Sequence, residues 1–301
     1  MPDLRKSRRK FKLLKKSLPK PPLPTRLQLE YFAELRKMLA YARALLKARL
    51  YPVLPELLDR AAQARGDSVQ LTAQSHADAQ SPGRRINRIM DRVSELFYKK
   101  FTHDRLEALA TKVANAVSDT QRTQLLEQVR RSIGIDLKTV ADTKLTGQLK
   151  QFAADNVALI KSIPQQLFDE VEKRVLTGMR EGTRHTELLT ELGERFGVAD
   201  SRMKLIARDQ VLKFNGALNA SRQQALGITR YTWRTAGDER VRGTPGGISP
   251  KGTHYERDGE VYSWDDPPGD PSDPADGGHP GQAINCRCWS EPLIADLVEE
   301  G

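Results

Sequence analysis

Apolar residues recur every three or four positions along most of the first 227 residues, which is the spacing of helices with one buried face. On this pattern we expect helices over residues 26–50, 56–64, 84–134 and 142–227, with a break at Pro52 between the first two. No comparable alternation of period two occurs in this part of the chain. The pattern therefore predicts a helical N-terminal two-thirds.

Proline and capping residues predict further breaks inside the last helical stretch. Proline is favoured in the first turn of a helix, so one helix is expected to end near Ile160 and the next to begin at Pro164. Asp200 or Ser201 can cap another helix, because short polar side chains accept hydrogen bonds from free backbone N–H groups. That last helix is expected to stop at Gly227.

The hydrophobic pattern changes after residue 227 and favours short strands. Tyr231–Trp233 has the composition of a strand. Asp258-Gly259 is a two-residue hairpin signal, so His254–Arg257 and Glu260–Trp264 are predicted to pair across it. A closing strand is expected over Cys286–Leu293. The predicted fold class is α+β, mainly α-helical with a small C-terminal β-rich, loop-rich module.

These patterns predict five segments. They are a basic, proline-rich arm (1–24), a helical segment (25–64), a linker (65–83), a helical domain (84–227) and a β-rich module (228–301). Hydrophobic residues make up 38% of the chain and aromatic residues only 6%, which suits extended helices with surfaces for partners better than one compact globule.

The net charge of +10 is unevenly distributed. Residues 228–301 contain 7 Lys/Arg and 14 Asp/Glu, so residues 1–227 hold the other 42 basic and 25 acidic residues. The acidic part is a poor candidate for phosphate binding, because like charges repel. The basic part is suited to DNA or to an acidic protein surface.

The arm contains the densest run of positive charge. One interpretation is a solvated, disordered tail, and the other is a segment that contacts nucleic acid or a protein partner. The residues proposed for such contact are Arg5, Lys6, Arg8, Arg9, Lys10, Lys12, Lys15 and Lys16.

Several classes of location and activity are disfavoured. No apolar segment typical of a signal peptide follows the charged N-terminus, and no apolar run is long enough for a membrane span, so no membrane association is expected. Cys286 and Cys288 are too close together to build a disulfide framework. No phosphate-binding loop of the Gly-Lys-Ser/Thr type is present, so no ATP-driven motor is implied. The host cytoplasm is the expected place of synthesis.

Several short motifs, in a fixed order, resemble the phage Mu F-like minor head protein family. The resemblance covers roughly residues 140–293 and rests on the set as a whole. The motifs are Asp155–Ile163, Leu205–Gln210, Leu226–Ile228, Tyr231–Thr235, Asp238–Arg242, His254, Gly259, His279–Gly281 and Asn285–Cys288. Residues 243–253 place His254 later than is usual for the family.

The resemblance implies a structural protein of a tailed bacteriophage, acting in head morphogenesis and procapsid assembly. It implies a location in the virion, inside the capsid near the portal. The implied partner is the portal protein, with the scaffolding protein, the major capsid protein and packaged DNA as further candidates. No catalytic role is expected.

The C-terminal cysteines and histidines form a candidate metal site. Cys286, Cys288, His254 and His279 offer sulfur and nitrogen ligands that suit a structural Zn²⁺. A single residue separates the cysteines, whereas two to four is the usual spacing. The alternative is a pair of reduced thiols, one packed and one exposed.

The remaining polar residues of the module are interpreted as structural. They are Asp238, Arg240, Arg242, Asn285 and Arg287, and we expect Asp238 to cap a turn while the arginines pair with local carboxylates. Two other functions stay open. One is a metal-dependent hydrolase or nuclease that uses the His/Cys/Asp set, and the other is a non-specific DNA-binding protein of the basic part.

Overall fold

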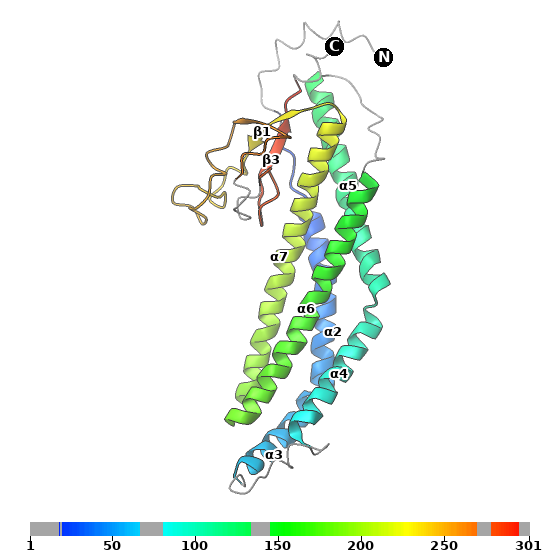
Figure 1. Cartoon of the computed structure of the whole chain (residues 1–301), viewed down its shortest axis with the longest axis vertical. Coiled ribbons are helices and arrows are strands. Elements are labelled where there is room, and N and C mark those ends of the chain that lie inside the picture. Colours follow the sequence, from blue (N-terminus) through cyan, green and yellow to red (C-terminus); the bar gives the residue numbers. More distant parts are fainter. Residues whose placement is uncertain (1–17, 19, 67–80, 134–144, 270–277, 295–301) are drawn as a thin grey trace. The chain divides into compact units, whose positions relative to one another are not determined.

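The computed structural model describes residues 18, 20–66, 81–133, 145–269 and 278–294 (Figure 1). It confirms the predicted fold class, with helices before residue 227 and a small antiparallel sheet after it. The helical elements are α2 (Thr25–Arg49), the 3-10 helix η2 (Tyr51–Val53), α3 (Leu54–Gly66), α4 (Pro82–Lys100), α5 (His103–Ile133), α6 (Leu145–Glu181) and α7 (His185–Ala225). The strands are β1 (Arg230–Arg234), β2 (Val261–Ser263) and β3 (Trp289–Pro292).

Two predicted breaks are wrong, because α6 and α7 are each continuous. Pro164 lies inside α6 and is buried, as are Ile163 and Leu167 near it in the helix. A proline inside a helix removes one backbone hydrogen bond, and burial of the apolar face offsets this loss. Asp200 lies inside α7 and forms an ion pair with Arg36 at 3.0 Å, so it does not cap a helix.

The described residues divide into two compact units that do not follow chain order. One comprises residues 30–109 and 154–206, and the other comprises residues 1–29, 110–153 and 207–301. Both units therefore draw on α6 and α7. The predicted boundaries between the five segments stay a prediction.

The first of these units is a helical bundle with an apolar core. Parts of α2, α4, α6 and α7 supply its buried residues, among them Leu35, Phe97 and Val171. The Phe97 ring packs against the Phe168 ring with centroids 5.4 Å apart. A polar pair is also buried here, since the Tyr31 hydroxyl donates to Asn156 Oδ1 at 3.0 Å.

The second unit joins helix ends to the sheet. The Arg222 guanidinium of α7 is buried and donates to the Ser118 carbonyl of α5 at 2.8 Å. Asn219, one turn earlier, donates to the carbonyl of Ser290 in β3 at 3.1 Å. The last turns of α7 thus connect α5 to the strand that precedes the C-terminus.

The sheet has the order β2-β1-β3, and both pairings are antiparallel. The hydrophobic core cluster beside it comes from β1 and from the loops, namely Tyr231, Trp233, Trp264, Ala283, Cys286 and Cys288. The core is therefore small, and much of the module consists of loop.

The predicted pairing of His254–Arg257 with Glu260–Trp264 is wrong. Residues 253–258 form turns, in which the Arg257 N–H donates to Thr253 O and the Asp258 N–H donates to Tyr255 O. The strand β2 pairs with β1 instead, so Tyr231 faces Tyr262 across the ladder. Gly259, with φ +92°, makes the turn, but its N–H donates to the Trp233 carbonyl of β1.

Candidate metal centre

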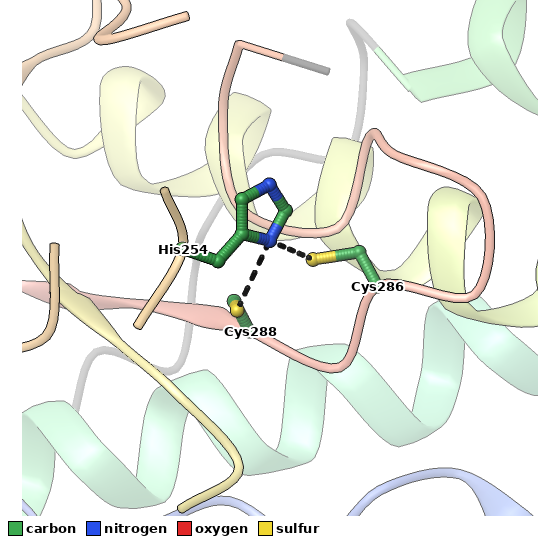
Figure 2. A group of neighbouring side chains, drawn as sticks. All are labelled: His254, Cys286 and Cys288. Atoms are coloured by element: carbon green, nitrogen blue, oxygen red, sulfur yellow. Dashed lines mark hydrogen bonds between the residues drawn. The ribbon is translucent and has the colours of Figure 1, made fainter. Parts of the chain in front are cut away.

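Three side chains that are distant in sequence meet inside the C-terminal module. His254, Cys286 and Cys288 place their ligand atoms within 4.8 Å of one another, and all three are buried (Figure 2). The His254 Nδ1 lies 3.6 Å from each of the two sulfur atoms. This arrangement corrects the alternative of one packed and one exposed thiol, since only 6% of Cys286 and 8% of Cys288 is exposed.

The distances fit a tetrahedral metal ion. Zinc binds sulfur at about 2.3 Å and imidazole nitrogen at about 2.0–2.1 Å, so a tetrahedral angle places the two ligand atoms about 3.6 Å apart. Both measured separations have this value. The single Nδ1 lone pair cannot point at two thiols at once, but it can point at an ion between them. The group therefore could hold a soft metal ion.

The spacing of the cysteines is explained by the extended chain that leads into β3. Alternate residues of an extended chain point to the same side. Burial alternates accordingly, with Cys286 and Cys288 buried and Arg287 between them partly exposed. One intervening residue is thus sufficient to bring both sulfur atoms to one ion.

His254 is held in place by the aromatic core. The ring of Trp233, from β1, packs edge-on against the imidazole with centroids 5.1 Å apart. The turns at residues 253–258 hold the backbone of His254 in position. Residues 243–253, the long segment before it, are closed on themselves, because the Gly243 N–H donates to Ser249 O at 2.8 Å. His254 therefore reaches the site despite the longer connection.

Helix α7 anchors the loop that carries the cysteines. Asp209 Oδ1 accepts the backbone N–H of Asn285 at 2.8 Å, and Arg208 Nε donates to Asn285 Oδ1 at 2.8 Å. Asn285 has φ +57°, a left-handed conformation that asparagine tolerates better than most residues. The motif Leu205–Gln210 and the motif Asn285–Cys288 thus contact each other directly.

Gly281 packs closely against Gly216 of α7, and its backbone N–H points to the sulfur of Cys286. The Gly281 N–H donates to Cys286 Sγ at 3.4 Å. A Cβ at Gly281, which has φ +89°, would lie 3.3 Å from the Gly216 Cα of α7. Gly281 therefore combines a backbone conformation and a contact that other residues do not accommodate.

Two arginines join further loops to this site. Arg287 forms a bidentate ion pair with the Asp238 carboxylate, and the Arg240 N–H donates to Asp238 Oδ1 at 3.1 Å. Arg242 Nη2 donates to the Ile284 carbonyl at 3.1 Å. Asp238 therefore caps a turn and pairs with an arginine at the same time, and the Arg287 hydrogen bond holds the pKa of Asp238 below its usual range.

The two buried thiols shift each other's pKa in opposite directions. A hydrogen bond from Cys288 holds the pKa of Cys286 well below its usual range, and His254 acts in the same direction. The same pairing, together with burial, raises the pKa of Cys288. A metal ion binds cysteine as the thiolate, so a bound cation would displace the protons of both thiols.

The structure does not bring His279 into the group. Its Nδ1 forms a hydrogen bond with the Tyr231 hydroxyl at 2.9 Å, and its ring packs against Trp264 with centroids 5.1 Å apart. Burial lowers its pKa. Within the described residues the candidate ligand set therefore has three members.

The basic residues proposed for contact, Arg5 to Lys16, lie outside the described residues. Lys20, just after them, donates to the Ala236 carbonyl at 2.8 Å. Four contributors to the metal centre are missing from the sequence-based site residues: Arg208, Asp209, Gly216 and Gly281. Arg208, Asp209 and Gly281 lie in motifs of the family resemblance, so the sequence could have identified these three as site residues.

The fold and site define a class of protein: a mainly helical chain with a small C-terminal module whose motif residues contact one another around a Cys/His group. Residues 169–291 match the family described as "Phage Mu protein F like protein". This match includes His254, Cys286 and Cys288, and it confirms the family resemblance over these residues.

One relative is similar over a longer part of the chain than the family match, but it has no described function. An "Uncharacterized protein" of Haemophilus influenzae (strain ATCC 51907 / DSM 11121 / KW20 / Rd) is 29% identical over 205 residues, which cover 67% of this chain and 42% of the relative. The chain thus spans less than half the length of that relative. No solved structure matches. None of the helices in the described ranges has the length and apolar character of a membrane span.

Proposed function

We propose that this chain is a minor head protein of a tailed bacteriophage that acts in procapsid assembly and associates with the portal. The observation that carries the proposal is the match of residues 169–291 to the Phage Mu protein F-like family. The contacts among the motif residues support it, because they join separate motifs of that family into one small module. The location that follows is the capsid interior near the portal.

The charge distribution adds DNA as a further proposed partner. Residues 1–227 carry 42 basic and 25 acidic residues. Contacts between Lys or Arg and phosphates release counterions, which favours binding at low salt and weakens it steeply as salt rises. The scaffolding and major capsid proteins are alternative acidic surfaces for the same basic residues.

The primary test is co-purification with the portal protein encoded in the same genome, at low and at high salt. A stoichiometric complex that persists at high salt is the expected result, because apolar contacts between helices are not screened by salt. Absence of a complex at both salt concentrations would contradict the portal association.

A pair of variants distinguishes DNA binding by the arm from a general effect of positive charge. In the first, the eight arm residues from Arg5 to Lys16 named above are replaced by Gln. In the matched control, eight exposed basic residues of the helices are replaced by Gln: Lys47, Arg49, Lys99, Lys112, Lys150, Lys173, Arg180 and Lys204. If the arm contacts DNA, the arm variant alone loses the salt-dependent binding to duplex DNA. Equal losses would indicate a diffuse charge effect and argue against a specific arm.

We also propose that His254, Cys286 and Cys288 hold a structural Zn²⁺. The N–S distances of 3.6 Å, the burial of all three side chains and the Gly281 N–H on one sulfur support this. When bound, the ion supplies a cross-link between the loops, which a module with so small a core needs. The test is the zinc content of the purified protein, expected at one ion per chain and lost in Cys286→Ser.

A further inference from the structure

We infer that the metal centre keeps one coordination position open to a polar cavity, and that this position takes a small oxyanion, a phosphate or carboxylate group, which also contacts Arg242. The inference rests on the proposed metal site. It adds a ligand class to a centre whose protein ligands number three.

The ligand count leaves one position of a tetrahedral ion without a protein donor. Within the described ranges, no fourth His, Cys, Asp or Glu side chain joins His254, Cys286 and Cys288. His279 forms its hydrogen bond with Tyr231, and Asn285 Oδ1 accepts from Arg208. Closed structural zinc sites have four protein ligands, whereas three ligands and an open position are typical of sites that bind an external molecule.

A cavity of about 180 Å³ lies against the three ligands. Its wall includes all three, together with Ser249 and Asn285. A water molecule occupies about 30 Å³ in the liquid, so the cavity has room for more than an ion and one water. Because each ligand lines this space, the open position of the ion would face it.

The charges around the cavity favour an anion. Two thiolates neutralise a divalent ion, so the centre itself carries no net charge. Arg240, Arg242 and Arg287 line the cavity, and no Asp or Glu is among its described lining residues. Arg287 is paired with Asp238, and Arg242 Nη2 donates to the Ile284 carbonyl, which places the Arg242 guanidinium beside the cavity. A guanidinium beside a metal ion is well suited to bind an oxyanion between them.

The residues that line the cavity suit the binding of a ligand better than its hydrolysis. Hydrolysis by a metal-bound water is assisted by a general base within hydrogen-bond reach of that water. Among the described residues, the lining supplies arginines, Ser249 and Asn285, and no carboxylate. The cavity is therefore built to hold a ligand, and a carboxylate or phosphate group of an assembly partner has the required chemistry.

The test uses the full chain with Co²⁺ in place of Zn²⁺, because the visible absorption of Co²⁺ reports both its thiolate ligands and any change in the fourth ligand. Inorganic phosphate and acetate are titrated separately, with chloride at equal ionic strength as the control. We expect a saturable change of the Co²⁺ bands with phosphate, acetate or both, and none with chloride.

Two variants locate the anion. Arg242→Gln is expected to weaken the saturable response about tenfold or more, with the response measured against that variant's own Co²⁺ spectrum without anion. Lys251→Gln, an exposed residue of the same loop region outside the cavity lining, is expected to leave the affinity unchanged.

The outcomes distinguish this inference from the metal proposal. Failure of the protein to bind Co²⁺ or Zn²⁺ would overturn the metal centre. A normal thiolate–Co²⁺ spectrum that neither oxyanion changes, or that chloride changes equally, would overturn the anion site and leave the metal proposal intact. A response that Arg242→Gln does not weaken would also overturn the bridging position.

Discussion

The helical bundle of residues 30–109 and 154–206 and the C-terminal module of residues 228–294 are stabilised in different ways. The bundle buries long rows of aliphatic and aromatic side chains, such as Leu35, Leu46 and Phe97. The hydrophobic core cluster of the module has six described members, two of which are the candidate metal ligands Cys286 and Cys288. A bundle of this kind tolerates changes at single polar positions, whereas the module depends on a few specific polar contacts.

Removal of the metal is expected to have the largest effect and to affect the module alone. His254→Ala or a strong chelator should destabilise the module on the order of 5–10 kcal/mol, since metal binding energy is folding energy in small metal-stabilised modules. The three tryptophans of the chain, Trp233, Trp264 and Trp289, all lie in the module. Tryptophan fluorescence therefore reports the module, while far-UV circular dichroism reports the helices.

The two signals should separate after metal removal, with the fluorescence transition shifted to lower temperature and the helical signal retained. His279→Ala is the matched control, because it removes a partly buried histidine of the same module that is not in the ligand group. If His254→Ala and His279→Ala lower the stability of the module equally, the metal centre contributes no more than ordinary packing. The proposed difference between the module and the bundle would then be wrong.

The next largest loss of stability is expected for a core substitution in the helical bundle. Phe97→Ala should cost about 3–5 kcal/mol, because the ring is fully buried and packs against Tyr98, Phe101 and Phe168. Chemical denaturation followed by circular dichroism measures this loss. Leu29→Ala, at a side chain that is 60% exposed, should change stability by less than about 0.5 kcal/mol. A loss for Phe97→Ala below 1 kcal/mol would contradict the importance of bundle packing.

A smaller effect is expected where the module packs on α7. Gly281→Ala should cost about 2–3 kcal/mol, because it adds a left-handed backbone penalty to a clash with Gly216. Gly237→Ala is the matched control, since Gly237 also has positive φ but faces open space, so only about 1 kcal/mol is expected. Equal losses of stability for the two variants, measured by fluorescence during thermal unfolding, would show that the close approach of Gly281 to Gly216 is not required.

The smallest effect is a dependence on pH from the Asp238–Arg287 pair. The folded-state pKa of Asp238 is lowered by its Arg287 hydrogen bond, so the pair stabilises the folded state above the unfolded pKa of about 4. This contribution is lost as pH falls below that value, through the folded pKa. Asp238→Asn should therefore narrow the difference in melting temperature between pH 5 and pH 3. An unchanged difference would show that the pair contributes nothing measurable.

The sequence predicted the helices better than their ends, for a physical reason. Periodicity records which face is buried, and this placed helices over residues 26–50 and 84–134 correctly. Pro164 and Asp200 looked like helix starts because their local preferences favour that position. In both cases tertiary contacts outweigh the preference: burial around Pro164, and the ion pair of Asp200 with Arg36.

The candidate site was predictable in composition but not in geometry. His254, Cys286 and Cys288 were candidate ligands from residue type alone. The exclusion of His279 depends on its hydrogen bond with Tyr231, which no local pattern encodes. The hairpin at Asp258-Gly259 was expected on turn chemistry, but His254 is buried in a turn and β2 pairs with β1. Long-range contacts thus determined the outcome at both positions.

The closed loop of residues 243–253 offers a practical point of attachment for a probe. Gly243 and Ser249 are joined by a backbone hydrogen bond inside the loop, and the Tyr255 N–H donates to Arg242 O, so the residues that flank the loop are held together. Pro245 and Gly246 at its tip are exposed, and a side chain at Gly246 would meet nothing within 4 Å. A short epitope or a fluorescent label inserted between them would leave the ligand residue His254 in place. Such a label would show whether the protein enters the head during assembly, as proposed above.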